Sequence, residues 1–464
     1  MQDYETKGFV MGISSLGVGS GILTQSVLDQ LRAADDAKRI KPLTLNIVNE
    51  NDKSAARDVL NAAMVNFRDA ANELQNTSLF DARKANVTGT SVAVTATAGS
   101  DIQSFTLNVT QLAQKQISES GSYTADTALV ASGTGSLSLT IGAKSYTINY
   151  DATTTLKTLK NSINKIAGAD VNASVVQVAT GDFRLFLSAA NEGAAQSISL
   201  TDTSALLSGT QLTTGLSTIQ AGQDATFTYN GQAITRSSNT VTDLVSGYTV
   251  ALKELGSSTV NVSQDRTNLE TRVDSFVKQY NAIMNEISKQ TKSSTDSKTR
   301  GIFSNDSIVN SMKSNIQNML GSISNAGGNL ENYGFSIDRS GIMSVDKTVL
   351  NTKIDANSNN VKAFFSGGDY TSATGTVTTL TGAFSSFYTT VNSFTKTNGD
   401  LDQVKNTITQ SLSDYQARKT SEIKRLDEKY AILKKKYTAY NSIINKFNSV
   451  SSLFTQLSTP ATKA

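Results

Sequence analysis

The sequence predicts an α+β fold with several domains, in which β-rich segments are inserted between two helical ends. Three observations support it. The chain has 464 residues, enough for about three domains. Apolar residues recur at helical spacing near both ends, and they alternate with polar residues in the middle. We therefore expect the helices before residue 80 and after residue 266 to pack together, with the β-rich domains nested between them.

The first helical region extends from residue 24 to about residue 80. Its apolar stripe follows alternating steps of four and three and consists of Ala56, Leu60, Ala63, Phe67, Ala70 and Leu74. The large members Leu60, Phe67 and Leu74 are candidate assembly residues. Thr24 is a suitable N-cap. Proline has no amide hydrogen and fits best in the first turn of a helix, so we expect two helices with a break near Pro42.

The β-rich part begins at about residue 81, where the spacing of apolar residues changes from helical to alternating. Segments at 87–94 and 105–109 alternate in this way and are bounded by glycine and serine. Farther along, Asn230-Gly231 separates two alternating segments, and Asn-Gly is the dipeptide that best fits a two-residue hairpin turn. We expect a hairpin there and more strands at 248–252 and 259–262.

A compact module is predicted between these strands. A hairpin turns at residues 142–144, and helical spacing follows over 155–167 and ends at Gly168. Two further strands are expected at 173–178 and 183–187. The order β-β-α-β-β indicates one α+β module.

Helical spacing returns after residue 266 and continues from Leu269 to Ile287. Three stretches rich in glycine, serine and threonine are interpreted as loops, namely residues 293–297, 321–328 and 367–381.

The strongest periodic signal is near the C-terminus. Apolar and tyrosine side chains there step by three and four without a break, which is the period of a coiled-coil seam. The seam consists of Ile423, Leu426, Tyr430, Leu433, Tyr437, Tyr440, Ile444 and Phe447. The alternative is one amphipathic helix buried in a domain. Eight basic and three acidic residues lie between Arg418 and Lys436, and we interpret them as a solvated helix face rather than a nucleic-acid site.

The composition argues against an enzyme. The chain has no histidine and no cysteine, which excludes Ser-His-Asp triads, Cys-His dyads and the usual zinc ligands. The net charge of +3 gives no footprint of a polyanion partner. Residues 1–5 are acidic where a secretory signal is basic, so we do not expect the general secretory route.

Two short motifs contain residue types that occur in binding sites, but their context favours a structural role. Residues 17–21 are rich in glycine, but no strand precedes them and no Lys-Ser or Lys-Thr follows, so they are interpreted as a leader before a helix. Asp338 and Asp346 flank Gly341 in a predicted hairpin, and a solvated turn explains them better than a metal site. We therefore expect no catalytic residues, no cofactor and no metal.

Several segments together resemble the flagellar filament cap family, also called hook-associated protein 2. The leader over residues 13–21 is similar to the start of that family, and Ser162-Ile163-Asn164 is similar to its Ile-Asn motif. The most specific segments are 227–231, 235–244 and 247–252, which include Arg236-Ser237-Ser238-Asn239. Residues 276–281 and 333–346 also match.

The resemblance implies a four-part organisation. Residues 11–45 and 400–464 would form a terminal coiled coil that inserts into the filament, and residues 46–80 and 266–399 a helical leg. Residues 81–115 and 222–265 would form a β-rich head domain. Residues 116–221 would form an outer α+β head domain with the Ile-Asn motif.

The resemblance also implies a secreted assembly factor at the distal tip of the bacterial flagellum, exported by the flagellar type III system without a cleaved signal peptide. It would form a ring, a pentamer on the filament, beneath which exported flagellin folds and polymerises. Its implied partners are its own copies, flagellin, an export chaperone and, in some members, host mucin. The alternatives are a hook-filament junction protein or a flagellar-tip adhesin.

Overall fold

The computed structural model describes residues 21–22 and 24–458, and the chain forms two compact units. Unit 1 combines Met1–Asn76 with Thr271–Ala464, and unit 2 consists of Thr77–Glu270. Unit 1 is mainly helical, whereas unit 2 consists mainly of antiparallel sheets. The predicted α+β multidomain fold, with β-rich segments inserted between helical ends, is confirmed.

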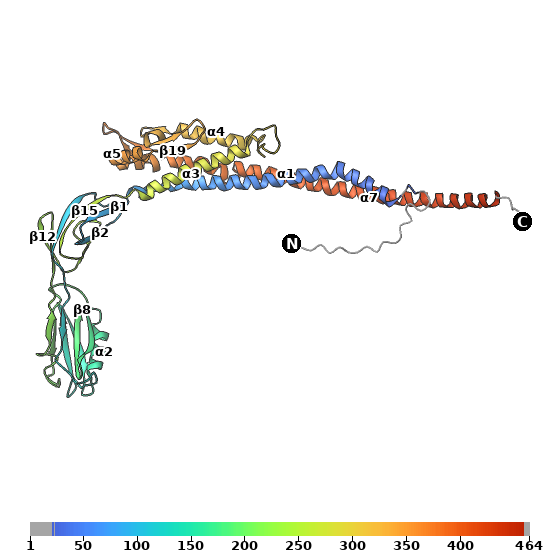
Figure 1. Ribbon diagram of the computed structural model, residues 1–464. Helices are drawn as coiled ribbons and strands as arrows, with labels where there is room; N and C mark the ends of the chain where they lie inside the picture. Colours follow the sequence, from blue (N-terminus) through green and yellow to red (C-terminus); the bar gives the residue numbers. More distant parts are fainter. Residues whose placement is uncertain (1–20, 23, 459–464) are drawn as a thin grey trace. The chain divides into compact units, whose positions relative to one another are not determined.

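Unit 1 is organised around two long helices from opposite ends of the chain. Its helices are α1 Gln25–Glu73, most of α3 Thr267–Gln290, α4 Ser307–Ser322, α5 Lys347–Ser366, α6 Ala383–Thr395 and α7 Asp400–Ser458. Helix α1 lies beside α7 and runs antiparallel to it, since Arg57 contacts the start of α7 at Leu401 and Arg32 contacts Asp427 (Figure 1). The predicted cap at Thr24 is confirmed, because its side chain accepts a hydrogen bond from the backbone N–H of Val27.

The expected break at Pro42 is wrong, because α1 continues through the proline as one helix. A proline inside a helix removes a backbone hydrogen bond and costs about 3 kcal/mol. Contacts with α7 on both sides of the proline, through Arg32 and Arg57, support both halves of the helix. Tertiary packing therefore overrides the local signal.

The centre of unit 1 is an aromatic cluster around Phe276 of α3. The ring of Phe276 lies 5.2 Å from that of Phe67 on α1, and 4.9 Å and 5.4 Å from those of Phe384 and Phe387 on α6. All four rings are fully buried. The predicted stripe residues Leu60 and Leu74 are buried as well.

Short hairpins complete unit 1. They are β16 Ser324–Asn325 with β17 Gly328–Asn329, β18 Phe335–Ile337 with β19 Met343–Val345, and β20 Gly368–Thr371 with β21 Val377–Leu380; the 3-10 helix η2 is Leu330–Tyr333. The predicted turn at Gly341 is confirmed. Interpreting 321–328 and 367–381 as loops is wrong, because both contain strand residues. Valine and threonine favour β20–β21, and Gly375 takes the positive φ of its turn.

Unit 2 contains two β-rich modules with separate cores. The inner module consists of β1 Arg83–Thr88, β2 Val92–Ala96, β3 Ser104–Gln111, β11 Ala225–Tyr229, β12 Gln232–Arg236, β13 Thr240–Val241, β14 Tyr248–Leu252 and β15 Gly256–Gln264. Its sheets have the orders β1-β15-β3-β11-β12 and β13-β14-β2. The predicted Asn230-Gly231 hairpin joins β11 to β12, and both turn residues have positive φ, as a type I′ turn requires. The 3-10 helix η1, Thr77–Phe80, precedes the module.

The outer module is inserted between β3 and β11 of the inner module. It consists of β4 Ile117–Glu119, β5 Gly135–Ile141, β6 Lys144–Tyr150, α2 Leu156–Ala167, β7 Val171–Ala179, β8 Asp182–Ala189, β9 Ile198–Asp202 and β10 Ser217–Gln220. The predicted β-β-α-β-β order is confirmed over β5 to β8. Helix α2 begins at a capping box between Thr155 and Thr158, and it buries Leu156, Leu159 and Ile163 in the module's core.

Truncation of the aromatic centre is expected to destabilise unit 1. Phe276→Ala should lower the free energy of unfolding by about 3–5 kcal/mol, because it removes a fully buried ring and leaves a cavity. The control Phe447→Ala removes an exposed ring and should change it by less than about 0.5 kcal/mol. Urea unfolding followed by far-UV circular dichroism measures both, because the long helices belong to unit 1. Equal effects of the two substitutions would contradict the assigned core.

Candidate functional site: the paired terminal helices

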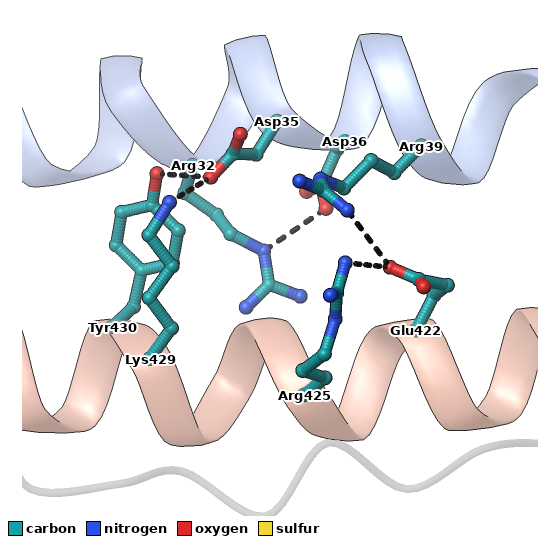
Figure 2. A network of polar contacts seen from close by, with 8 residues as sticks. All are labelled: Arg32, Asp35, Asp36, Arg39, Glu422, Arg425, Lys429 and Tyr430. Atoms are coloured by element: carbon teal, nitrogen blue, oxygen red, sulfur yellow. Dashed lines mark hydrogen bonds and ion pairs between the residues drawn. The ribbon is translucent and has the colours of Figure 1, made fainter.

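A layer of charged side chains joins the N-terminal half of α1 to α7 (Figure 2). The carboxylate of Asp35 on α1 accepts hydrogen bonds from the ammonium of Lys429, at 2.7 Å, and from the hydroxyl of Tyr430, at 2.9 Å. The guanidinium of Arg32 lies 5.6 Å from the centre of the Tyr430 ring, and the ammonium of Lys429 lies 5.3 Å from it. Tyr430 thus contacts two cations with its ring and an anion with its hydroxyl.

Further ion pairs extend this layer along both helices. Arg32 contacts Asp36 of its own helix at 3.0 Å and Asp427 of α7 at 2.6 Å. Glu422 of α7 lies 2.6 Å from Arg425 and 3.7 Å from Arg39 of α1. The layer therefore contains charges of both signs on both helices.

The charged layer favours one register of the two helices. In the observed register Arg32 faces Asp427 and Arg39 faces Glu422. Moving α7 by one heptad in one direction would place Lys434 opposite Arg32 and Lys429 opposite Arg39. Moving it by one heptad in the other direction would place Glu422 opposite Asp35. Exposed ion pairs contribute little stability, but like charges in the wrong registers make the layer selective.

The charged layer shifts the pKa values of two of its side chains, Asp35 and Tyr430. The hydrogen bonds from Lys429 and then Tyr430 hold the pKa of the Asp35 carboxyl below its ordinary value. Burial, reinforced by the hydrogen bond to Asp35, raises the pKa of the Tyr430 hydroxyl. At neutral pH Asp35 is therefore ionised and Tyr430 is protonated, which is the state that this geometry needs.

The predicted seam is only partly covered. Leu426 is buried, whereas Tyr440 is 54% exposed and Phe447 is 76% exposed. The half-buried members are Ile423, Tyr430, Leu433, Tyr437 and Ile444. The stripe residue Phe67 packs against α3, so the structure does not bring the predicted stripe and the predicted seam together.

Beyond its pairing with α1, the end of α7 carries an apolar surface that extends past Phe447, the last residue of the predicted seam. We name it the exposed stripe, and it consists of Ile443, Phe447, Val450, Leu453, Phe454 and Leu457, all of them exposed. All of them except Leu453 are spaced by steps of four and three. The seam period continued past Phe447 leads to Ser451, Phe454 and Ser458, so it predicts Phe454 but not the other three residues.

The two carboxylates that flank Gly341 have local structural roles. Asp338 accepts hydrogen bonds from the backbone N–H groups of Ser340 and Ile342, and Asp346 caps α5. Among residues 21–22 and 24–458, no group of three or more carboxylates is arranged to hold a metal ion. No described helix is long and apolar enough to cross a membrane. Of the predicted leader at 17–21, residues 17–20 lie outside the described residues.

Comparison with known proteins decides the family. Models of the N-terminus and the C-terminus of flagellar hook-associated protein 2 match residues 20–116 and 222–449. The chain belongs to the flagellar hook-associated protein 2 family. Neither match includes residues 117–221, which contain the outer module.

Named relatives of this family support the assignment. The chain is 30% identical over 349 residues to flagellar hook-associated protein 2 of Campylobacter jejuni, covering 66% of this chain and 54% of that protein. It is 29% identical over 293 residues to that of Escherichia coli K12, covering 60% of this chain and 62% of that protein. The chain thus spans less than two thirds of either relative.

The solved structure of the D1-D2-D3 domains of the flagellar cap protein FliD from Escherichia coli has a similar fold. It aligns with a TM-score of 0.56 at 23% identity, covering 76% of this chain and 99% of that chain. The α+β architecture is therefore shared with a member of the hook-associated protein 2 family.

Removing the charge of Asp35 is expected to weaken the pairing of α1 with α7. Asp35→Asn should increase amide exchange over residues 25–40 and leave residues 60–74 protected, because the aromatic cluster holds the second segment. Glu428→Gln, which removes an exposed charge next to Lys429, is the control. Unchanged exchange over residues 25–40 in Asp35→Asn would show that the charged layer does not hold the helices together.

Lowering the pH is expected to destabilise the folded protein through the carboxyl of Asp35. The folded protein lowers the pKa of Asp35, so the ionised carboxyl stabilises the folded state. This stabilisation is fully present at a pH above the pKa of Asp35 in the unfolded chain, about 3.9. It is lost as the pH falls through the lower pKa of the folded protein. The difference in thermal midpoint between Asp35→Asn and the unaltered protein should therefore shrink as the pH is lowered from about 5 to about 3. Circular dichroism measures it, and a difference that is constant over this range would contradict the assignment.

Proposed function

We propose that this protein caps the distal end of the flagellar filament as an oligomeric ring, and that flagellin folds and polymerises beneath it. The observation that carries the proposal is the exposed stripe of α7. An apolar helix face of this kind is unfavourable in water and favours burial against other subunits. Membership of the hook-associated protein 2 family supports the filament tip as the place of burial.

Different parts of the structure would have different roles in the cap. The terminal helices, predicted to comprise residues 11–45 and 400–464, would insert into the end of the filament, where the exposed stripe becomes covered. The remainder of unit 1 would form the leg, and the two β-rich modules would form the plate of the ring, with five copies on the filament. The role is structural and needs no catalytic residue or cofactor.

The proposed route to the tip is export through the flagellar type III system, with a chaperone covering the end of α7 before export. The absence of cysteine suits this route, because no disulfide has to form or be avoided outside the cell. The partners are thus further copies of the chain, flagellin and the chaperone, and the final location is extracellular.

A second role, binding of host mucin by the outer module, is favoured by one observation. Residues 117–221 lie outside both family matches, as expected of a part that varies with the surface it meets. The full-length protein should then bind immobilised mucin saturably, and replacing the outer module with a short turn should abolish binding. Equal binding by both proteins would remove this role and leave the capping proposal untouched.

Charges placed on the exposed stripe are expected to abolish capping. Phe447→Asp combined with Phe454→Asp should leave unit 1 folded, because both rings are exposed, but should make burial of the stripe unfavourable. The control is Asn445→Asp with Ser452→Asp, which adds the same charge to the opposite face of the helix.

The measurement uses cells that lack the gene. With unaltered protein or the control, flagellin should polymerise, whereas with the stripe variant it should appear as monomer in the medium. Normal filaments with the stripe variant would contradict the proposed insertion, and normal filaments in cells without any of the proteins would contradict capping itself.

A further inference from the structure

The outer module is joined to the inner module by two adjacent stretches of chain. Gln114 and Gln223 form an antiparallel bridge there, with N···O distances of 2.9 Å and 3.1 Å. Two neighbouring strands alone make a hinge, because a module attached along one line can still swing about it. The orientation of the outer module therefore depends on contacts away from this bridge.

A loop of the outer module supplies such contacts. The N–H of Gly193 donates to the carbonyl of Gln114 at 3.0 Å, and the N–H of Ala194 donates to the carboxylate of Asp224 at 2.8 Å. Both acceptors lie where the chain leaves and re-enters the inner module. The loop is thus seated on the base of the bridge.

Glu192 extends the contact to a different part of the inner module. Its Oε2 accepts a hydrogen bond from the backbone N–H of Asn239 at 2.8 Å, and its Oε1 accepts one from the side-chain amide at 3.0 Å. Both oxygens of one carboxylate are therefore bound by one residue. Charge-assisted hydrogen bonds of this kind are stronger than neutral ones and define a direction.

Asn239 is itself anchored in the inner module. Its side chain donates to the carbonyl of Ala113 and accepts from the N–H of the same residue, both at 2.8 Å. Its carbonyl accepts from the N–H of Leu252 at 2.8 Å. A displacement of Glu192 is therefore resisted by β14 and by the end of β3 together.

Two glycines allow the loop to approach so closely. Gly193 is buried with φ +115, and a Cβ there would lie 2.8 Å from the Cβ of Ser237. A Cβ at Gly222 would lie 2.5 Å from the carbonyl oxygen of Gly193. A side chain at either position would push the loop away from the inner module.

We propose that Glu192 and Asn239 form a clasp that fixes the orientation of the outer module on the inner module, so that unit 2 moves as one body. The bridge between Gln114 and Gln223 is the hinge, and the clasp is the contact that restricts rotation of the outer module about it. The proposal gives a role to Asn239, the last residue of the Arg236-Ser237-Ser238-Asn239 segment. It is independent of the capping proposal.

The test uses spin labels on the full-length protein. Because the chain has no cysteine, Ser199→Cys on β9 and Thr235→Cys on β12, both exposed, give one label in each module. Double electron-electron resonance should show one narrow distance distribution. Glu192→Gln keeps the shape of the side chain but replaces one acceptor oxygen with an NH₂ group, which faces an N–H donor of Asn239. This substitution should broaden the distance distribution. Glu254→Gln, an exposed carboxylate with no role in the clasp, should not.

Amide exchange provides the second measurement. In Glu192→Gln the N–H of Asn239 should exchange at least about tenfold faster, because it loses a charged acceptor. The N–H groups of the two cores, such as those of Leu139 and Val260, should stay protected, which shows that both modules remain folded. A distribution already broad in the unaltered protein, or one unchanged by Glu192→Gln, would overturn the proposal.

Discussion

The pairing of two helices from opposite ends of the chain is the contact on which unit 1 depends. It closes a loop of several hundred residues, and such a closure is stable only if the ends meet in a well-packed core. The aromatic cluster anchors α1, because Phe67 packs against Phe276 of α3, which in turn contacts α6. The first turns of α7 are buried at Leu401 and Val404. The insertion of unit 2 is compatible with this pairing, since β1 and β15 are antiparallel neighbours and bring entry and exit together.

The helix pair changes character along its length, and this change follows the chemistry of its residues. Near Arg57, which donates to the carbonyl of Leu401, α1 and α7 bury apolar side chains such as Leu60 and Leu401. Around Asp35 and Tyr430 the contact consists of ion pairs and hydrogen bonds, which specify register but contribute little stability when exposed. At Phe454 the apolar surface of α7 is uncovered. The buried part of the pair thus lies beside the core, and the uncovered apolar part lies at the end of α7.

Sequence patterns predicted the elements whose signals are local. The Asn230-Gly231 turn, helix α2 and the long helical ends follow from turn chemistry and periodicity, which tertiary contacts reinforce. The continuation of α1 through Pro42 was not predicted, because the interactions that decide it are tertiary. Strands β20 and β21 were not predicted, because threonine-rich segments occur in both loops and strands. Of the site, periodicity found Leu426 and Tyr430 but not the partners of Tyr430. Ion pairs between residues as distant as Asp35 and Lys429 leave no periodic signal.

Because one β-rich module is inserted into the other, the residues that stabilise each module differ from those that orient the two modules. The inner and outer modules bury separate clusters, around Phe227 and Leu139 respectively, so each has its own source of stability. A connection made of two adjacent stretches of chain then adds no core of its own. Orientation between the modules must come from a few polar contacts, and Glu192 and Asn239 are placed to provide them. Such residues can be essential to the geometry of an assembly while contributing little to the stability of either module.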